Sequence, residues 1–287
     1  MSSEILNKAL QEPSRRPGKT AIGPKNATVE IVVISLPGAT ERRRNIAAMF
    51  EGTGLSWSYF DAHSSLKCSG LRYDLGEVKR LFGRTLSAPE IAVCSSHVAV
   101  LSDFLEHGST DYIMVLEDDV IFDTDFPLDD FSAFCAKHRI DYVRLFGKHY
   151  AKAIRLGFFF DRSIVRFKTT PAGAQAYLMS KAGVRKFLES YRLIDATVDL
   201  AMDKFWITQL PLYSIFPYPI IERYSPTSIP MQASLKELSG WGTVLRLRNR
   251  VIEKARKTAG NLALRASDRE MRQKSWRFRQ IFDAKDQ

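Results

Sequence analysis

Short apolar runs alternate with amphipathic stretches over the first part of the chain. Residues 29–36 are rich in β-branched side chains and end at Pro37-Gly38, a pattern that predicts a buried strand followed by a turn. Residues 39–52 place apolar side chains on one helical face, with Thr40 at the N-cap position. Residues 57–62 predict a second strand. This order of elements is typical of the start of an open α/β sheet.

The clearest helix signal lies at residues 87–90, where a serine, a proline and a glutamate form a capping box with proline in the first turn. It predicts a helix over 88–107, which is followed by glycine. Two apolar segments, 111–116 and 120–122, come next and are separated by three acidic residues. The first of them predicts another buried strand.

The later apolar runs continue this alternation. They predict strands over 142–146, 176–179 and 212–216, and helices over 180–190 and 199–209. We therefore expect one α/β domain over residues 28–234. Residues 1–27, rich in Pro, Gly, Ser and Lys, predict a flexible N-terminal arm, and residues 235–287 predict a basic helical tail.

Charge adds an expected partner to this picture. The formal net charge is +10, and residues 246–285 alone contain 13 lysines and arginines. Such a segment is a solvated helix, a nucleic-acid patch or a membrane-surface helix. Trp276 and Phe278 lie among the charges, which favours a helix on an anionic membrane surface, with no nucleic acid expected.

The cysteines and the hydropathy pattern indicate the compartment. Cys68, Cys94 and Cys135 form no C-x-x-C pair, which disfavours a thiolate zinc site and a disulfide framework. We find no signal-peptide pattern and no run approaching about 18 apolar residues. We therefore expect a cytoplasmic protein, either soluble or peripheral on the cytoplasmic face of the inner membrane.

The chemistry is expected at the acidic triplet Glu117-Asp118-Asp119. A strand buried on both faces cannot hold three carboxylates, so the triplet must lie at its carboxyl end, where open α/β sheets bind ligands. Hard oxygen ligands suit Mn²⁺ or Mg²⁺, which also bridge diphosphate oxygens. Alternation along an extended chain predicts that Glu117 and Asp119 face one side and Asp118 the other. The alternative is a solvated acidic loop.

The order and spacing of several blocks resemble glycosyltransferase family 25, the bacterial lipopolysaccharide-type and collagen-type galactosyltransferases. The blocks are 33–36 with Glu41-Arg42-Arg43-Arg44, 59–62, 86–97, 115–120, 145–147, 172–180, 181–188, the segment around Asp199, and 226–229. They cover roughly two-thirds of the chain. The resemblance implies a GT-A-type fold, a single Rossmann-like nucleotide-binding domain, followed here by the basic helical tail.

The resemblance also implies an activity: metal-assisted, inverting transfer of a hexose, most often galactose from UDP-galactose, to a lipopolysaccharide- or lipooligosaccharide-type acceptor. A nucleotide-sugar donor and a glycan or glycolipid acceptor are then the partners. The resemblance places metal and diphosphate binding on Asp119 first and Glu117 second, with Mn²⁺ or Mg²⁺ as cofactor. A divalent ion held there stabilises the leaving nucleoside diphosphate.

Four further residues are expected to serve the donor. Asp118 belongs to the acidic triplet, and Arg43 presents a guanidinium fork suited to phosphate or uridine. Asp61 ends the second predicted strand, where Rossmann-like sheets often bind the nucleotide, although a turn role is equally consistent. Tyr177 follows a run of small residues and either contacts the sugar or packs beneath it.

An inverting transfer needs a general base near the acceptor hydroxyl. The resemblance falls best on Asp199, and Glu222 and His149 are the rival candidates. His97, in the middle of an apolar helix, is either a buried structural histidine or a residue that orients the acidic triplet; we do not expect it to bind metal.

Two other functions fit parts of the sequence. A nucleotide-sugar hydrolase or nucleotidyltransferase would use the same acidic metal site without a saccharide acceptor. A nucleic-acid-binding protein would use the basic tail, and deletion of residues 240–287 would then abolish its main activity. The transferase hypothesis predicts instead that this deletion weakens membrane association and leaves turnover on a soluble acceptor largely intact.

Overall fold

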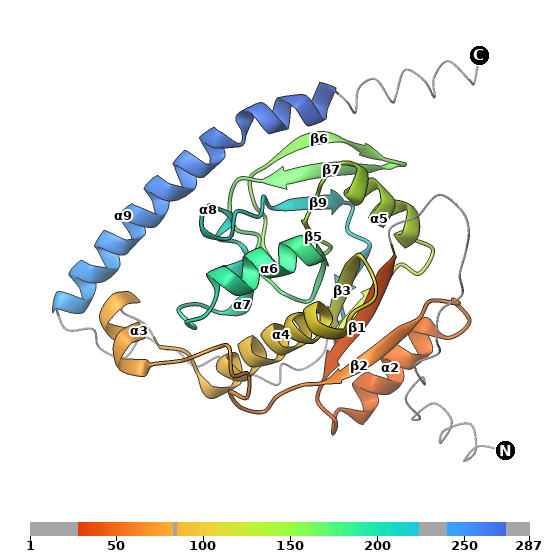
Figure 1. The fold of residues 1–287 in the computed structure, drawn as a ribbon, viewed down its shortest axis with the longest axis horizontal. Helices are drawn as coiled ribbons and strands as arrows, with labels where there is room; N and C mark the ends of the chain where they lie inside the picture. Colours follow the sequence, from red (N-terminus) through yellow and green to blue (C-terminus); the bar gives the residue numbers. More distant parts are fainter. Residues whose placement is uncertain (1–27, 83–84, 224–239, 274–287) are drawn as a thin grey trace.

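The computed structural model describes residues 28–82, 85–223 and 240–273, which are built around an eight-stranded mixed sheet (Figure 1). The strand order is β2-β1-β3-β8-β5-β9-β7-β6. The strands are β1 (Val29–Ser35), β2 (Trp57–Asp61), β3 (Tyr112–Glu117), β5 (Tyr142–Arg144), β6 (Ala153–Phe159), β7 (Arg162–Phe167), β8 (Ala176–Ser180) and β9 (Tyr213–Phe216). A separate antiparallel ribbon pairs β4 (Val120–Phe122) with β10 (Ile220–Glu222).

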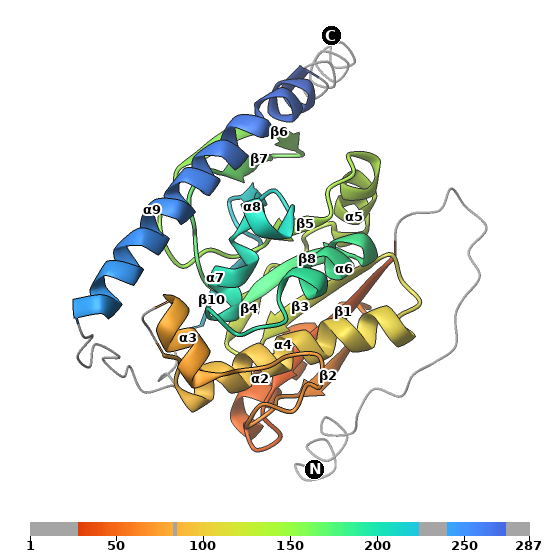
Figure 2. The ribbon, with the colours of Figure 1, turned by 60° about the vertical axis from the view of Figure 1, so that its left-hand side comes forward.

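Helices cover both faces of the sheet (Figures 1 and 2). One face carries α4 (Ala88–His107), α6 (Lys181–Ser190), α7 (Val198–Met202) and α8 (Phe205–Thr208), with α3 (Leu75–Phe82) near its margin; α2 (Thr40–Phe50) and α5 (Leu128–Lys137) cover the other face. The alternation within β1 explains this arrangement. Val32 and Ile34 enter the core beneath α4 and α6, whereas Ile31 and Val33 enter the core beneath α2 and α5.

The predicted α/β class is confirmed, and so are most of the predicted strands. β1, β2 and β3 are parallel neighbours. The central residues of β1 and β3 are buried, and those of the edge strand β2 are half-buried. The capping box is also confirmed, because the Glu90 amide donates to Ser87 Oγ and the Ser87 amide donates to Glu90 Oε2. β8 runs antiparallel between β3 and β5, so the sheet is mixed rather than wholly parallel.

Two parts of the fold differ from the sequence expectation. The hairpin of β6 and β7 was not predicted, because its pattern of buried and exposed residues is irregular and β6 contains a register shift after Arg155. The helix predicted over 199–209 is wrong as a single element: it is split into α7 and α8. Lys204, between them, has φ −78° and ψ 58°, outside the helical region.

A long helix, α9 (Gly240–Ala263), runs along the outside of the molecule beside α3 and α8 (Figure 2). Helical backbone resumes over 265–273. The buried guanidinium of Arg166 in β7 forms two 2.7 Å hydrogen bonds to Asp268 and one of 2.8 Å to Asn261. Among the described residues, no helix is long and apolar enough to cross a membrane. The predicted arm 1–27 and the aromatic residues Trp276 and Phe278 lie outside the described residues.

Candidate active site at the carboxyl edge of the sheet

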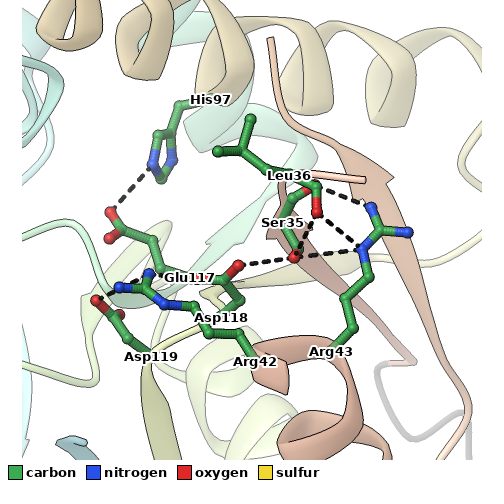
Figure 3. A network of polar contacts seen from close by, with 8 residues as sticks. All are labelled: Ser35, Leu36, Arg42, Arg43, His97, Glu117, Asp118 and Asp119. Carbon is green, nitrogen blue, oxygen red and sulfur yellow. Dashed lines mark hydrogen bonds and ion pairs between the residues drawn. The ribbon is translucent and has the colours of Figure 1, made fainter. Parts of the chain in front are cut away.

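The carboxyl ends of three neighbouring parallel strands meet at one edge of the sheet. The register places Ser35 of β1 beside Asp61 of β2, and Ile34 of β1 beside Glu117 of β3. The acidic triplet therefore begins at the last residue of β3 and continues into the turn before β4. Ligands of open α/β sheets bind at such an edge, and most of the predicted donor-side residues come together there (Figure 3).

Asp118 is held by the neighbouring strand and helix. Ser35 Oγ donates to Asp118 Oδ2 at 2.7 Å, and Arg42 Nη1 donates to Asp118 Oδ1 at 2.9 Å (Figure 3). Both carboxylate oxygens therefore have partners within the protein. In this structure Asp118 fixes the turn and positions the Arg42 guanidinium at the edge of the sheet.

Asp119 is the residue of the triplet with an unsatisfied oxygen. Its Oδ2 lies 3.8 Å from Arg42 Nη1, whereas its Oδ1 is buried without a hydrogen-bond partner among the described residues. Burial, and next the charge of Glu117, raise the pKa of Asp119 to about 7, although Arg42 opposes the shift. A buried, unpartnered carboxylate oxygen is costly, which indicates that a cation or donor completes this site.

Glu117 points to the opposite side, toward α4 (Figure 3). Its Oε1 lies 3.4 Å from His97 Nε2, and the other ring nitrogen of His97 lies 3.1 Å from the Tyr177 hydroxyl. His97 and Tyr177 are both buried, so Tyr177 packs beneath the site, the second of its two expected roles. The two residues form a polar chain that leads from the core to the Glu117 carboxylate.

The predicted alternation of the three carboxylates is wrong. Asp118 and Asp119 both approach Arg42, whereas Glu117 approaches His97. The reason is local: β3 ends at Glu117, and the next two residues form a turn, so the two-residue period of an extended strand no longer applies.

Arg43 ties the ends of β1 and β2 together. Its Nη2 donates to the backbone oxygen of Ser35 at 3.0 Å and forms an ion pair with Asp61, and its Nε donates to the backbone oxygen of Leu36 at 3.2 Å. The guanidinium also lies 4.7 Å from the centre of the Tyr59 ring. Apart from this ion pair, the Asp61 side chain is exposed to solvent. The two predicted donor residues thus form one unit beside the acidic triplet.

A second buried network supports the edge from below. Arg144 Nε donates to Asp203 Oδ1 at 2.6 Å, and the guanidinium also donates to the backbone oxygens of Ala172 and Gly173. The amides of these residues donate to Asp203 at 3.1 Å and to Asp199 at 2.8 Å, respectively. Ala172 and Gly173 both have positive φ, so the network holds a backbone conformation that is otherwise disfavoured.

The predicted general base, Asp199, belongs to this network. Burial would raise its pKa, but hydrogen bonds from Thr197 and the Gly173 amide, together with the charge of Arg144, lower its pKa overall. A carboxylate stabilised in this way is a weaker base. For Asp203 burial outweighs the charge of Arg144, and its pKa is raised.

The two rival base candidates lie differently. The antiparallel ribbon sets Glu222 opposite Val120, and the Arg223 amide donates to the Asp119 backbone oxygen at 2.6 Å. Glu222 is exposed, and its charge contributes to the raised pKa of Asp119, so it lies beside the acidic triplet. His149 is exposed on the loop after β5, and its backbone amide donates to the backbone oxygen of Pro171.

The donor set at this edge consists of oxygens, which suits Mn²⁺ or Mg²⁺ rather than a thiophilic metal. No group of three or more metal-binding side chains occurs in the part of the chain that the structure describes. The residues present would hold such an ion through one or two carboxylates, which is a usual mode of Mg²⁺ binding. The unpartnered Oδ1 of Asp119 is the observation that favours it.

Sequence reasoning missed Ser35 and Arg144, and among the three arginines of 42–44 it preferred Arg43 to Arg42. Ser35 and Arg42 hold the acidic turn and Arg144 holds the supporting loop. An arginine within the strand pattern of 142–146 was the one available signal, because a charge in a buried strand requires a buried partner.

An α/β sheet with a carboxylate cluster at its carboxyl edge has the arrangement at which open α/β folds bind their ligands. Comparison with known sequences then names the family. The family model "Glycosyltransferase family 25 (LPS biosynthesis protein)" matches residues 28–205. The chain belongs to glycosyltransferase family 25, and it is a glycosyltransferase of lipopolysaccharide or oligosaccharide biosynthesis.

Two curated relatives agree with this assignment. Lacto-N-neotetraose biosynthesis glycosyltransferase LgtE of Neisseria meningitidis serogroup B is 29% identical over 64% of this chain and 71% of its own length. The protein of the same name from Neisseria gonorrhoeae is 28% identical over the same shares. Among solved structures, A197 from STIV aligns with 70% of this chain and 96% of its own at 12% identity, with a TM-score of 0.36, too low to support an argument.

Proposed function

We propose that the enzyme transfers a hexose, galactose from UDP-galactose in the first instance, with inversion to a lipopolysaccharide- or lipooligosaccharide-type acceptor, assisted by a divalent metal. The observation that carries the proposal is the unpartnered, buried Oδ1 of Asp119 at the ligand-binding edge of the sheet. Family membership and the relatives in lacto-N-neotetraose biosynthesis support the glycan acceptor.

Asp119 would hold Mn²⁺ or Mg²⁺, and Glu117 would join it only by turning away from His97. The ion would supply Lewis-acid stabilisation of the leaving diphosphate. The protein's own residues prepare that site. Asp118 keeps Arg42 at the edge, so that its positive charge adds to the field that favours a diphosphate. Arg43 and Asp61 form the adjacent unit toward which the nucleoside would bind.

For the acceptor side, the contacts favour Glu222 over Asp199 as general base. Asp199 is half-buried and accepts the Gly173 amide, and its lowered pKa weakens it as a base. Glu222 is exposed beside the acidic triplet, where an acceptor hydroxyl has access to it. Asp199 then serves to position the 171–175 loop, whose Gln175 backbone oxygen accepts the Glu117 amide at 2.8 Å.

The test is a panel of nucleotide sugars incubated with the purified enzyme and Mn²⁺, with and without a panel of lipooligosaccharide-type oligosaccharide acceptors. Release of nucleoside diphosphate and formation of a new glycoside from one donor, both lost in Asp119→Ala, are expected. Equal release with and without acceptor and no glycoside would favour the nucleotide-sugar hydrolase instead. Absence of turnover together with absence of UDP–Mn²⁺ binding by calorimetry would overturn the proposal.

A further inference from the structure

α9 has an inner face that is fixed to the enzyme. A Cβ placed on Gly260 would approach the Phe205 ring to 2.9 Å, so the helix backbone lies directly against α8. Asn261 accepts a 2.8 Å hydrogen bond from Arg166 and donates to the backbone oxygen of Lys168. α9 is therefore held in one orientation, and its opposite face is directed away from the protein (Figure 2).

The opposite face carries a row of exposed apolar side chains. Val244, Val251 and Leu262 are 55%, 61% and 57% exposed. They are seven and eleven residues apart, close to two and three turns of about 3.6 residues, so they lie on one line along the helix. Leu247, 63% exposed, widens the row. We refer to these four residues as the outer stripe.

Positive charges border the outer stripe. The exposed basic side chains of the described segment are Arg248, Arg250, Lys254, Arg256, Arg265, Arg269 and Arg272. Residues 244–273 contain nine basic and three acidic residues. Two of the acids pair with basic residues of the sheet and helix layers beneath, because Asp268 binds Arg166 and Glu253 lies 3.7 Å from Lys204. The outward surface is thus strongly cationic around an apolar centre.

We propose that the outer stripe and its bordering cations dock α9, lying flat, onto an anionic phospholipid surface. Such a helix places apolar side chains at the boundary of headgroups and acyl chains, while lysines and arginines reach the phosphates. Each cation near an anionic surface strengthens binding by roughly fivefold. This inference extends the proposed function to the surface on which the enzyme works, and it does not depend on which sugar is transferred.

The charge distribution argues against two other occupants. A second copy of the 244–273 segment would bring seven exposed cations against seven of the same sign, which opposes pairing. A nucleic acid would engage the cations but would leave the apolar row without a partner, since its affinity comes from phosphate contacts. An anionic lipid surface would contact both the apolar side chains of the outer stripe and the cations that border it.

The test is co-sedimentation of the full chain with vesicles of phosphatidylethanolamine and phosphatidylglycerol, or of phosphatidylcholine alone. The variant Val251→Glu places a charge in the middle of the outer stripe. Its matched control, Phe160→Glu, makes the same change of charge at a side chain that is 69% exposed in the β6–β7 turn. Turnover on a soluble acceptor is measured in parallel, which separates loss of docking from loss of the enzyme.

We expect wild type and Phe160→Glu to bind the anionic vesicles, to bind phosphatidylcholine poorly, and to dissociate as salt is raised. Val251→Glu should bind at least tenfold more weakly with unchanged turnover. Equal binding by the two variants, or equal binding to both kinds of vesicle, would overturn the proposal. So would light scattering that shows a wild-type dimer dissociated by Val251→Glu, because the stripe would then be a contact between copies.

Discussion

Asp119 illustrates how a single residue can serve function at the expense of stability. Its carboxylate is only 18% exposed and lies next to two other acids, and within the described residues its ion-pair partner is Arg42, at 3.8 Å. In the free enzyme this arrangement destabilises the fold, because a charged group has lost water without gaining full compensation. A site built to receive a cation is expected to have this property.

The substitution Asp119→Asn should therefore stabilise the enzyme in the presence of a chelator while abolishing turnover. Removal of the charge should increase the free energy of unfolding by about 1 kcal/mol or more, equivalent to roughly 2–4 °C in Tm for a domain of this size. Differential scanning fluorimetry with EDTA and with Mn²⁺ measures this effect. Mn²⁺ should raise the Tm of wild type only; a decrease in Tm for the chelated variant would show that the carboxylate is already satisfied.

Glu222 and Asp199 allow a direct comparison of two carboxylates. Glu222→Gln should lower kcat by about 10²- to 10⁴-fold, the usual contribution of a general base, with little change in UDP–Mn²⁺ affinity or Tm. Asp199→Asn should instead lower the free energy of unfolding by about 1.5–3 kcal/mol, because it weakens a charged hydrogen bond to the Gly173 amide.

Steady-state kinetics, calorimetry and thermal unfolding of both variants separate these roles. If Asp199→Asn has wild-type stability and a greatly reduced kcat, Asp199 is the base and the assignment to Glu222 is incorrect.

At the scale of elements, the ion pair between β7 and the segment after α9 is the most informative contact. Arg166 and Asp268 are both buried and doubly hydrogen-bonded, although 102 residues separate them. Asp268→Asn should cost about 3–5 kcal/mol, because it leaves a buried guanidinium without its counter-charge. Urea denaturation measures the loss.

A double substitution provides the control for that experiment. Arg166→Met combined with Asp268→Leu removes both charges and should recover much of the stability. If Asp268→Asn is as stable as wild type, the pair does not anchor the C-terminal segment.

Some elements of the fold are predictable from the sequence and others are not. β1, β3 and α4 were predictable because uniform apolar runs and a capping box specify them locally. The β6–β7 hairpin and the break between α7 and α8 were not, since the first lacks a regular period and the second depends on contacts with distant residues such as Arg144. The acidic triplet was found, but the side chains that orient it, Ser35 and Arg42, become evident only when β1, α2 and β3 are in place.

For the whole molecule, the C-terminal segment is a structural part of the enzyme. Deletion of residues 264–287 removes Asp268 and the buried Met271 and exposes one side of Arg166. We expect the deletion to lower Tm at least as much as Asp268→Asn, with turnover falling in step with the folded fraction. An unchanged Tm would mean that the segment is dispensable, as the sequence alone implied.

The position of β9 determines where the folding unit of this enzyme ends. The family match ends at residue 205, whereas β9 (Tyr213–Phe216) lies in the interior of the sheet, hydrogen-bonded to β5 on one side and β7 on the other. Excision of the matched segment would leave two open sheet edges and would separate the β6–β7 hairpin from its neighbours. The stretch that matches the family is therefore smaller than the stretch that must fold cooperatively, and an expression boundary or gene fusion placed at residue 205 would divide a single folding unit.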